Sequence, residues 1–200
     1  MKQILVSASR EYLVKIGSGL LRSLGDETAT VCKAQTVAII SDSHVWPLYG
    51  EAATNSLEKA GFRVIHYTFP AGEESKNGQT YLSILNFLAE NKLTRTDCVV
   101  ALGGGVVGDM AGFVSATFLR GIAYIQVPTT LLAAVDSSVG GKTAIDLDAG
   151  KNLAGAFYQP RLVLCDTDTL TTLPEDIFRE GCAEVIKYGI LYDPQLFSPL

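Results

Sequence analysis

The stretch that decides the fold is Asp97-Cys98-Val99-Val100-Ala101-Leu102-Gly103-Gly104-Gly105-Val106-Val107-Gly108-Asp109. Its apolar run up to Leu102 predicts a buried strand. The residues that follow satisfy G-x-G-x-x-G between that strand and an expected helix. Glycines let main-chain amides approach a phosphate group, and the helix N-terminus adds partial positive charge. The stretch therefore predicts a phosphate-binding turn, with Asp109 expected to cap the first turn of the helix.

A standard Rossmann site is a weaker interpretation of this turn. The usual version lies in the first βαβ unit and is followed about 20 residues later by an acidic residue that binds ribose. Here the next strand, residues 124–127, ends at Pro128-Thr129, where no carboxylate stands. The sequence favours phosphate binding over the standard dinucleotide fingerprint.

Outward from the turn, short apolar runs alternate with helical patterns. Alternation of this kind predicts βαβ units and a parallel sheet covered on both faces, an α/β fold. Residues 3–17 look like a strand pair or an antiparallel edge, and a domain boundary is expected near Pro174. The expected strands are residues 36–41, 62–67, 97–102, 124–127 and 162–165. One helix is expected to end near residue 60, and two further helices are expected at residues 79–91 and 175–191.

Composition excludes several classes of protein. The chain has 200 residues, 48% hydrophobic and 18% charged, with a net charge of −5, which argues against disorder, coiled coil and a nucleic-acid partner. The longest uncharged run, between Gly121 and Asp136, is too short for a membrane helix. Arg10 and Glu11 interrupt any signal-peptide core, so a cytoplasmic location is expected.

The four cysteines, Cys32, Cys98, Cys165 and Cys182, are too widely spaced for a metal knuckle or a redox pair. We expect buried free thiols in a reducing compartment.

A second glycine motif resembles the end of a P-loop. Gly140-Gly141-Lys142-Thr143 has the right ending, but the position five before Gly141 holds Asp136 where a P-loop has glycine. A carboxylate there would repel phosphate, so an NTPase is rejected. Lys142 and Lys151 either hold an oxyanion or are solvated loop charges, and the sequence leaves both interpretations open.

The last expected helix carries Glu180, Glu184 and Lys187 on one face, at spacings of four and three. The default interpretation is a solvated ion-pair face. The functional alternative is one carboxylate metal ligand beside an ammonium group for an anionic substrate. His44 and His66 lie far away in the sequence and are expected to be surface or strand residues.

Taken together, these motifs resemble the 3-dehydroquinate synthase family over essentially the whole chain. The resemblance implies an N-terminal Rossmann-like NAD-binding α/β domain, residues 1–174, and the beginning of a C-terminal α-helical metal domain, residues 175–200. The matching segments are residues 70–80, 103–109, 126–133, 135–143, 150–152, 155–160 and 183–187.

The resemblance also implies roles for individual residues. It assigns substrate or catalytic roles to Arg120, Asp136, Lys142, Asn152 and Lys187, and it assigns a metal ligand to Glu184. The NAD contacts that it implies are Asp42, Glu73, Glu74, Ser75, Lys76, Gly104, Gly105, Val106, Val107, Gly108, Asp109, Thr129, Thr130, Lys142, Lys151, Thr169, Leu170, Thr171 and Thr172.

The implied activity is a carbon–oxygen lyase reaction of the shikimate pathway. A phosphorylated keto acid, 3-deoxy-D-arabino-heptulosonate 7-phosphate, becomes 3-dehydroquinate and phosphate through transient oxidation by NAD, β-elimination, reduction and intramolecular aldol closure. A divalent metal, zinc or cobalt, polarises the oxidised carbonyl. Lysines stabilise the anionic groups, NAD is regenerated each turn, and a homodimer is expected for the full-length enzyme.

One departure from the family stands out. Its zinc is held by the carboxylate at Glu184 and by two later histidines, whereas the two histidines here precede residue 70. We expect an N-terminal portion that folds and binds NAD without metal or turnover, with an unpartnered apolar face on the helix at residues 175–191. Another sugar-phosphate cyclase, a metal-dependent glycerol or alcohol dehydrogenase and an isolated nucleotide-binding module remain alternatives.

Overall fold

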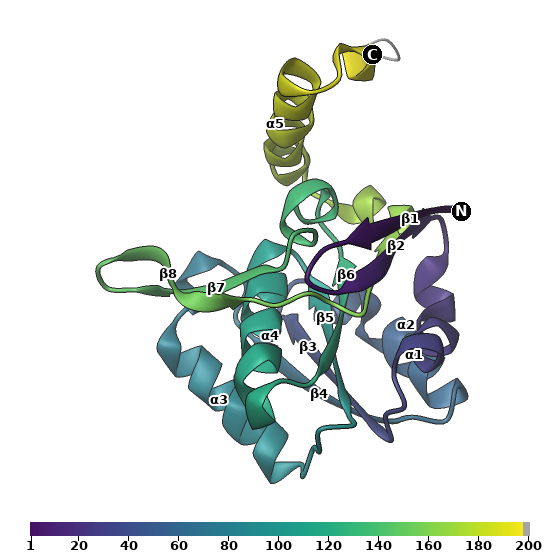
Figure 1. The fold of residues 1–200 in the computed structure, drawn as a ribbon, viewed down its shortest axis with the longest axis vertical. Helices are drawn as coiled ribbons and strands as arrows, with labels where there is room; N and C mark the ends of the chain where they lie inside the picture. Colours follow the sequence, from purple (N-terminus) through teal and green to yellow (C-terminus); the bar gives the residue numbers. More distant parts are fainter. Residues whose placement is uncertain (198–200) are drawn as a thin grey trace.

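A seven-stranded, mostly parallel sheet forms the centre of the protein (Figure 1). The computed structural model describes residues 1–197. Only β1 runs antiparallel to its neighbour, β2, which confirms the expected antiparallel edge and the α/β class. Across the sheet the strands are β1 (Lys2–Ser7), β2 (Glu11–Gly17), β9 (Leu162–Asp166), β6 (Ala123–Pro128), β5 (Cys98–Gly103), β3 (Thr36–Asp42) and β4 (Arg63–Phe69).

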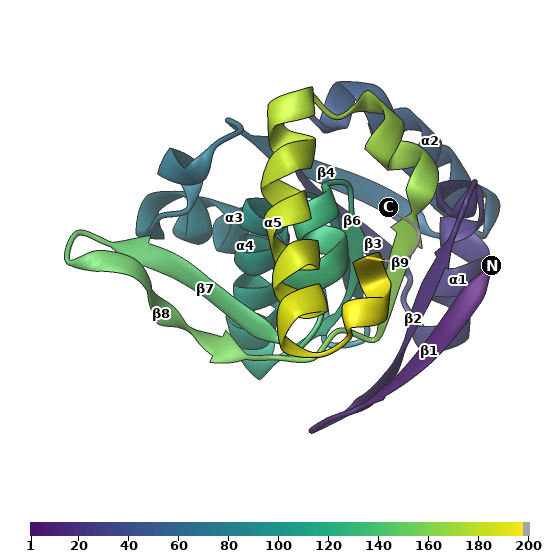
Figure 2. The same ribbon diagram turned by 90° about the horizontal axis from the view of Figure 1, so that it is seen from above.

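Helices cover both faces of this sheet. Figure 2 shows α3 and α4 on one side of the strands and α1 and α2 on the other. Successive side chains of a strand point to opposite faces, so Ile39 packs with the α1–α2 core and Ile40 with the α3–α4 core. The helices are α1 (Leu24–Val31), α2 (Trp46–Lys59), α3 (Gly78–Glu90), α4 (Gly105–Thr117) and α5 (Glu175–Leu191).

Burial on both faces explains why the central strands read as continuous apolar runs in the sequence. Every residue of β5 and β9 is buried, and so are the first six residues of β3. The strands and helices expected from these runs are confirmed, with ends that differ by at most two residues. The helix at residues 175–191 is confirmed at both ends.

The sequence analysis missed helix α1 and the hairpin formed by β7 (Lys142–Leu147) and β8 (Gly150–Phe157). The hairpin projects from the body as an arm (Figure 1). Of the two interpretations left open for Lys142 and Lys151, the loop assignment does not hold, since each lies in a strand of this arm. β8 begins Gly-Lys-Asn and has no buried residue, so it lacks the apolar pattern that identifies a strand.

Helix α5 projects from one end of the α/β body (Figure 1). Its apolar side chains Phe178, Ile186, Ile190 and Leu191 are exposed, the last two by 69% and 61%. The expected unpartnered face is therefore present within residues 1–197. No helix in this part of the chain combines the length and apolar character needed to cross a membrane.

The contact between α1 and α2 leads to a stability prediction. A Cβ at Gly25 would lie 2.1 Å from the Ser56 carbonyl oxygen, whereas a Cβ at Gly78 would meet nothing within 4 Å. Gly25→Ala should therefore lower the free energy of unfolding by about 2 kcal/mol or more through overpacking. Gly78→Ala should change it by less than about 0.5 kcal/mol. Urea unfolding of both variants measures this, and equal stabilities would contradict close helix packing at Gly25.

Candidate functional site

The glycine turn links β5 to α4 at the carboxyl edge of the sheet. β5 ends at Gly103, Gly104 is the N-cap, and α4 begins at Gly105. The Thr129 amide donates to the Gly103 carbonyl over 3.0 Å, which holds the end of β6 beside the turn. The first amides of α4 have no partner within the helix, so this end can bind an anion.

Side chains around the turn leave room that only glycine preserves. A Cβ at Gly104 would lie 3.1 Å from Thr130 Cγ2, and one at Gly105 would lie 3.3 Å from Ser137 Oγ. Thr129 is buried beside the turn, and among the described residues its hydroxyl has no hydrogen-bond partner. A buried hydroxyl without a partner is costly unless a ligand supplies one. The turn therefore fits a phosphate-containing cofactor.

The predicted turn residues differ in their access to such a cofactor. Residues 104–106 are partly exposed, so their main chain and the side chain of Val106 border the open space. Val107 is fully buried in the α3–α4 core, and a Cβ at Gly108 would meet the Gln126 side chain at 2.6 Å. Val107 and Gly108 could reach a cofactor only through their main chain.

Asp109 forms a buried ion pair instead of capping α4. No acidic residue lies in the first turn of α4, so the capping prediction is wrong. The Asp109 carboxylate lies 2.6 Å from Lys76 Nζ, which also donates to Asn152 Oδ1 over 2.6 Å. Burial raises the pKa of Asp109, while the hydrogen bond and charge of Lys76 lower it. One ammonium group thus joins α4 to the hairpin.

A cavity of about 540 Å³ lies between α4, the hairpin and the segment before it. Its volume is in the range of small-molecule sites. Four of the predicted site residues line it together: Asp109, Asp136, Lys142 and Asn152. These residues are spread over 44 positions of the sequence, and the hairpin brings Lys142 and Asn152 close to α4.

Helix α5 closes one end of this arrangement. The Tyr188 hydroxyl donates to Asp136 Oδ1 over 3.0 Å, and Lys142 Nζ lies 3.9 Å from Asp136 Oδ2. The hydrogen bond to Asp136 raises the pKa of Tyr188. Sequence reasoning missed Tyr188, although its spacing of four from Glu184 places both on one helix face.

Glu184 and Lys187 form the expected ion pair on α5. The hydrogen bond to Glu184 raises the pKa of Lys187. Within residues 1–197, no three His, Cys, Asp or Glu side chains are grouped so as to hold a metal. Glu184 offers one carboxylate, so the described residues do not by themselves form a metal centre.

The segment before α3 lies at the outer rim of the site. Residues 73–75 form a short 3-10 helix. Glu73 is 3.2 Å from Lys151 Nζ on the hairpin, and Ser75 donates to the Pro70 carbonyl. Lys151 is therefore an exposed rim charge that pairs with a carboxylate.

Two further groups of predicted cofactor residues lie where β3 and β9 end. Asp42 Oδ1 accepts from the His44 and Val45 amides over 2.8 and 2.9 Å. Residues 169–172, which include Leu170 and Thr171, belong to a 3-10 helix after β9. Tyr49 ties this 3-10 helix to α2, since its hydroxyl donates to the Thr169 carbonyl over 3.1 Å. The carboxyl ends of parallel strands thus share one edge with the glycine turn.

The structure does not bring Arg120 to the cavity. Arg120 follows α4, whose 13 residues extend about 20 Å from the glycine turn. It lies next to Gly121, which faces Tyr158 at the opposite end of the helix. Within one chain, Arg120 is separated from the other predicted substrate residues.

The buried carboxylate predicts a pH dependence. Burial raises the native pKa of Asp109 above the unfolded value of about 3.9, so the native state binds this proton more tightly. The stability of the wild type relative to Asp109→Asn should therefore rise as the pH falls through the native pKa, then level off below about 3.9. Urea unfolding of both proteins along a pH series measures this, and a flat difference would contradict it.

Comparison with known proteins agrees with this geometry. The family model described as "3-dehydroquinate synthase N-terminal" matches residues 66–180. The 3-dehydroquinate synthase of Geobacter metallireducens is 52% identical over 189 residues, which cover 94% of this chain and 52% of that protein. The chain thus spans about half the length of the curated relatives it matches.

Two solved structures of other synthases have a similar fold. A 2-deoxy-scyllo-inosose synthase complexed with carbaglucose-6-phosphate, NAD+ and Co2+ is 33% identical with a TM-score of 0.87, covering 93% of this chain and 50% of that one. The 2-epi-5-epi-valiolone synthase of Streptomyces hygroscopicus, with NAD+ and Zn2+ bound, is 30% identical with a TM-score of 0.84, covering 96% and 54%. The shared fold, the glycine turn and the match over residues 66–180 show that the chain belongs to the 3-dehydroquinate synthase family.

Proposed function

We propose that this chain is the NAD-binding portion of a 3-dehydroquinate synthase. In the whole enzyme it would convert 3-deoxy-D-arabino-heptulosonate 7-phosphate to 3-dehydroquinate and phosphate. The observation that carries this proposal is the cavity that unites Asp109, Asp136, Lys142 and Asn152 beside the glycine turn. Identity favours this substrate over that of another cyclase, since the Geobacter synthase is 52% identical and the inosose synthase 33%.

NAD would bind with its pyrophosphate over the amides of Gly104, Gly105 and Val106. The Thr129 hydroxyl, which lacks a partner within the described residues, would bind it from the end of β6. The ends of β3 and β9, with Asp42 and residues 169–172, would border the rest of the cofactor. NAD bound there supplies a hydride acceptor that returns the hydride later in the cycle.

The lysines would hold the anionic groups of the substrate. The Lys142 side chain is 61% exposed and 3.9 Å from its nearest carboxylate, so its ammonium is available to a phosphate or carboxylate. Lys187 projects from α5, where Glu184 keeps it protonated. Asp136, oriented by Tyr188, would accept hydrogen bonds from substrate hydroxyl groups. Asn152, fixed by Lys76, would bind a further polar group.

The remaining assignments require residues outside the described part of the chain. Residues 1–174 would form the NAD domain, and α5 would begin a helical domain that covers its exposed apolar face. Glu184 would supply one ligand to a divalent metal there. Because Arg120 lies at the far end of α4, it could reach a substrate only from a second copy, which fits the expected homodimer.

The glycine turn predicts how NAD affinity responds to substitution. Gly105 and Gly78 are both the first residue of a helix, α4 and α3. Gly105→Val should weaken NAD binding at least about tenfold, because its side chain enters the space that Ser137 borders at 3.3 Å. Gly78→Val should leave it unchanged. Calorimetric titration of the chain with NAD measures both, and equal affinities would contradict NAD binding at the turn.

The reaction class can be tested in a chimera of this chain with the C-terminal half of the Geobacter metallireducens relative. The chimera should release phosphate from the keto-acid substrate without accumulating NADH. Lys142→Met should lower kcat by about a hundredfold or more, whereas Lys33→Met, which is distant from the cavity, should leave kcat unchanged. Net NADH formation would instead indicate a dehydrogenase. Phosphate retention by an NAD-binding chimera would contradict the synthase while leaving the NAD site intact.

A further inference from the structure

Two thiols lie in contact at the end of the sheet opposite the glycine turn. Cys32 follows α1, and Cys98 is the first residue of β5. Their sulfur atoms are 3.4 Å apart, although 66 positions separate them in the sequence. All four cysteines are free thiols, as the sequence predicts, and three of them are buried. Their spacing in the sequence does not reveal that Cys32 and Cys98 lie in contact. The sequence could not reveal it, because the contact depends on α1 packing against the sheet.

One of these thiols borders a surface hollow of about 270 Å³. Cys32 lines the hollow with 7% of its surface accessible, whereas Cys98 lies fully buried behind it. A small solute that enters the hollow therefore meets Cys32 first. Cys98 is placed to react only through Cys32.

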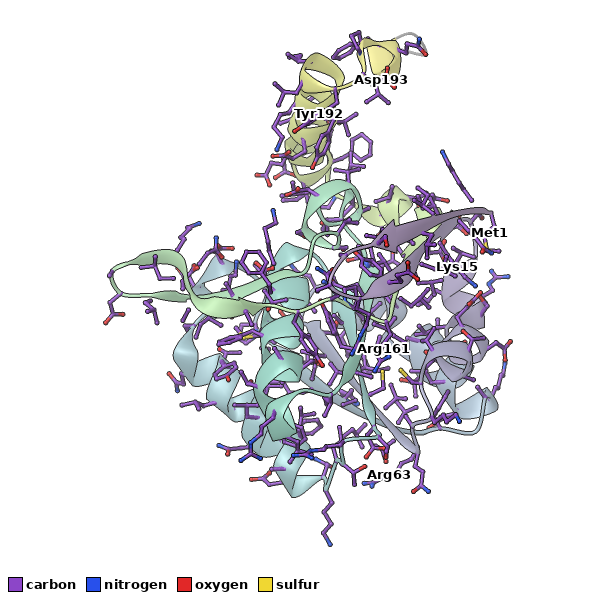
Figure 3. All side chains as sticks on the ribbon, viewed as in Figure 1. Met1, Lys15, Arg63, Arg161, Tyr192 and Asp193 are labelled. Atoms are coloured by element: carbon purple, nitrogen blue, oxygen red, sulfur yellow. The ribbon has the colours of Figure 1, made fainter. Side chains whose placement is uncertain are left out.

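The hollow is strongly cationic in a chain whose net charge is negative. Arg10, Lys33, Arg95 and Arg161 line it, and within residues 1–197 none of them forms an ion pair with a carboxylate. The nearby Asp97 carboxylate is occupied by the amides of Gln35, Thr36 and Thr94. Figure 3 shows Arg161 far from Tyr192 and Asp193 at the end of α5.

Charge and hydrogen bonding shift the pKa values of the two thiols in opposite directions. The hydrogen bond with Cys98 and the charge of Arg161 lower the pKa of Cys32, against the opposing effect of burial. Pairing with Cys32 and burial raise the pKa of Cys98. Cys32 therefore reaches the reactive thiolate state more easily, and Cys98 remains a thiol beside it.

We propose that Cys32 and Cys98 form a reversible disulfide when a peroxide enters the cationic hollow. The Cys32 thiolate attacks one oxygen of the peroxide, the O–O bond breaks, and the departing hydroxide takes a proton to become water. The resulting sulfenic acid at Cys32 is attacked by the Cys98 sulfur, which gives up its proton as a second water leaves. Two thiols are oxidised, one hydrogen peroxide is reduced to two waters, and a thiol reductant reverses the bond.

Peptide mapping of the whole chain tests this proposal. After hydrogen peroxide treatment and alkylation, mass spectrometry should find Cys32 joined to Cys98, two hydrogens lighter than the reduced pair. A thiol reductant should restore both thiols. Burial raises the pKa of Cys165 to about 12, so Cys165 should stay reduced and serve as an internal control. The double variant Cys165→Ser/Cys182→Ser should keep the cross-link, and Cys32→Ser should lose it.

A pair of arginine variants tests the role of the hollow. Arg161→Gln should slow cross-linking several-fold, because less of Cys32 is then thiolate. Arg63→Gln is the matched control, since Arg63 begins β4 as Arg161 directly precedes β9, but Arg63 does not line the hollow. Equal rates in the two variants would overturn the role of the hollow. Oxidation of Cys32 to sulfinic acid without a cross-link, or unreacted thiols where Cys182 is oxidised, would overturn the disulfide itself.

Discussion

A single buried ammonium group holds the site together. Lys76 is 5% exposed, and its Nζ lies 2.6 Å from both Asp109 of α4 and Asn152 of the hairpin. Burying a charge is costly unless every partner is in place. The hairpin and α4 are therefore fixed to one another, because displacing either leaves a buried charge unpaired. The Lys76 carbonyl, which accepts from the Asp146 amide over 2.8 Å, adds a second attachment to the arm.

This constraint determines where the cavity forms. β7 and β8 pair with each other and not with the main sheet, so pairing alone does not set their position. The position of the hairpin is set by its contacts with α4 and by the hydrogen bond between Asn152 and Lys76. These contacts hold Lys142 and Asn152 over α4, the helix that begins at the glycine turn. A chain with net charge −5 thereby gathers positive charge locally, in side chains and in the amides of α4, where an anionic ligand needs it.

The sequence predicted the parts of the fold that depend on local patterns. The apolar runs of β3, β5 and β9 are readable because both faces of these strands are buried. The glycine turn is readable because a close main-chain approach requires residues without a side chain. The hairpin was not readable, since β8 has no buried residue and gains its position from Lys76, far away in the sequence.

Contacts between residues far apart in the sequence could not be predicted for the same reason. Asp109 was expected to cap α4, because the sequence does not show that Lys76 arrives beside it. The Tyr188–Asp136 hydrogen bond and the Cys32–Cys98 contact likewise join residues 52 and 66 positions apart. The family resemblance supplied the list of site residues, but only the geometry separates Arg120 from the others.

The two halves of the site differ in what stabilises them. The glycine turn is built on β5 and α4, whose side chains are buried in the main core. Its shape therefore persists as long as the α/β body is folded. The acidic end of the cavity depends on Tyr188 of α5, a helix with an exposed apolar face. Covering that face would fix Tyr188, and through it Asp136, without moving the turn. The glycine turn and the acidic end of the cavity are thus separable in this fold, because they belong to parts of the chain with different packing.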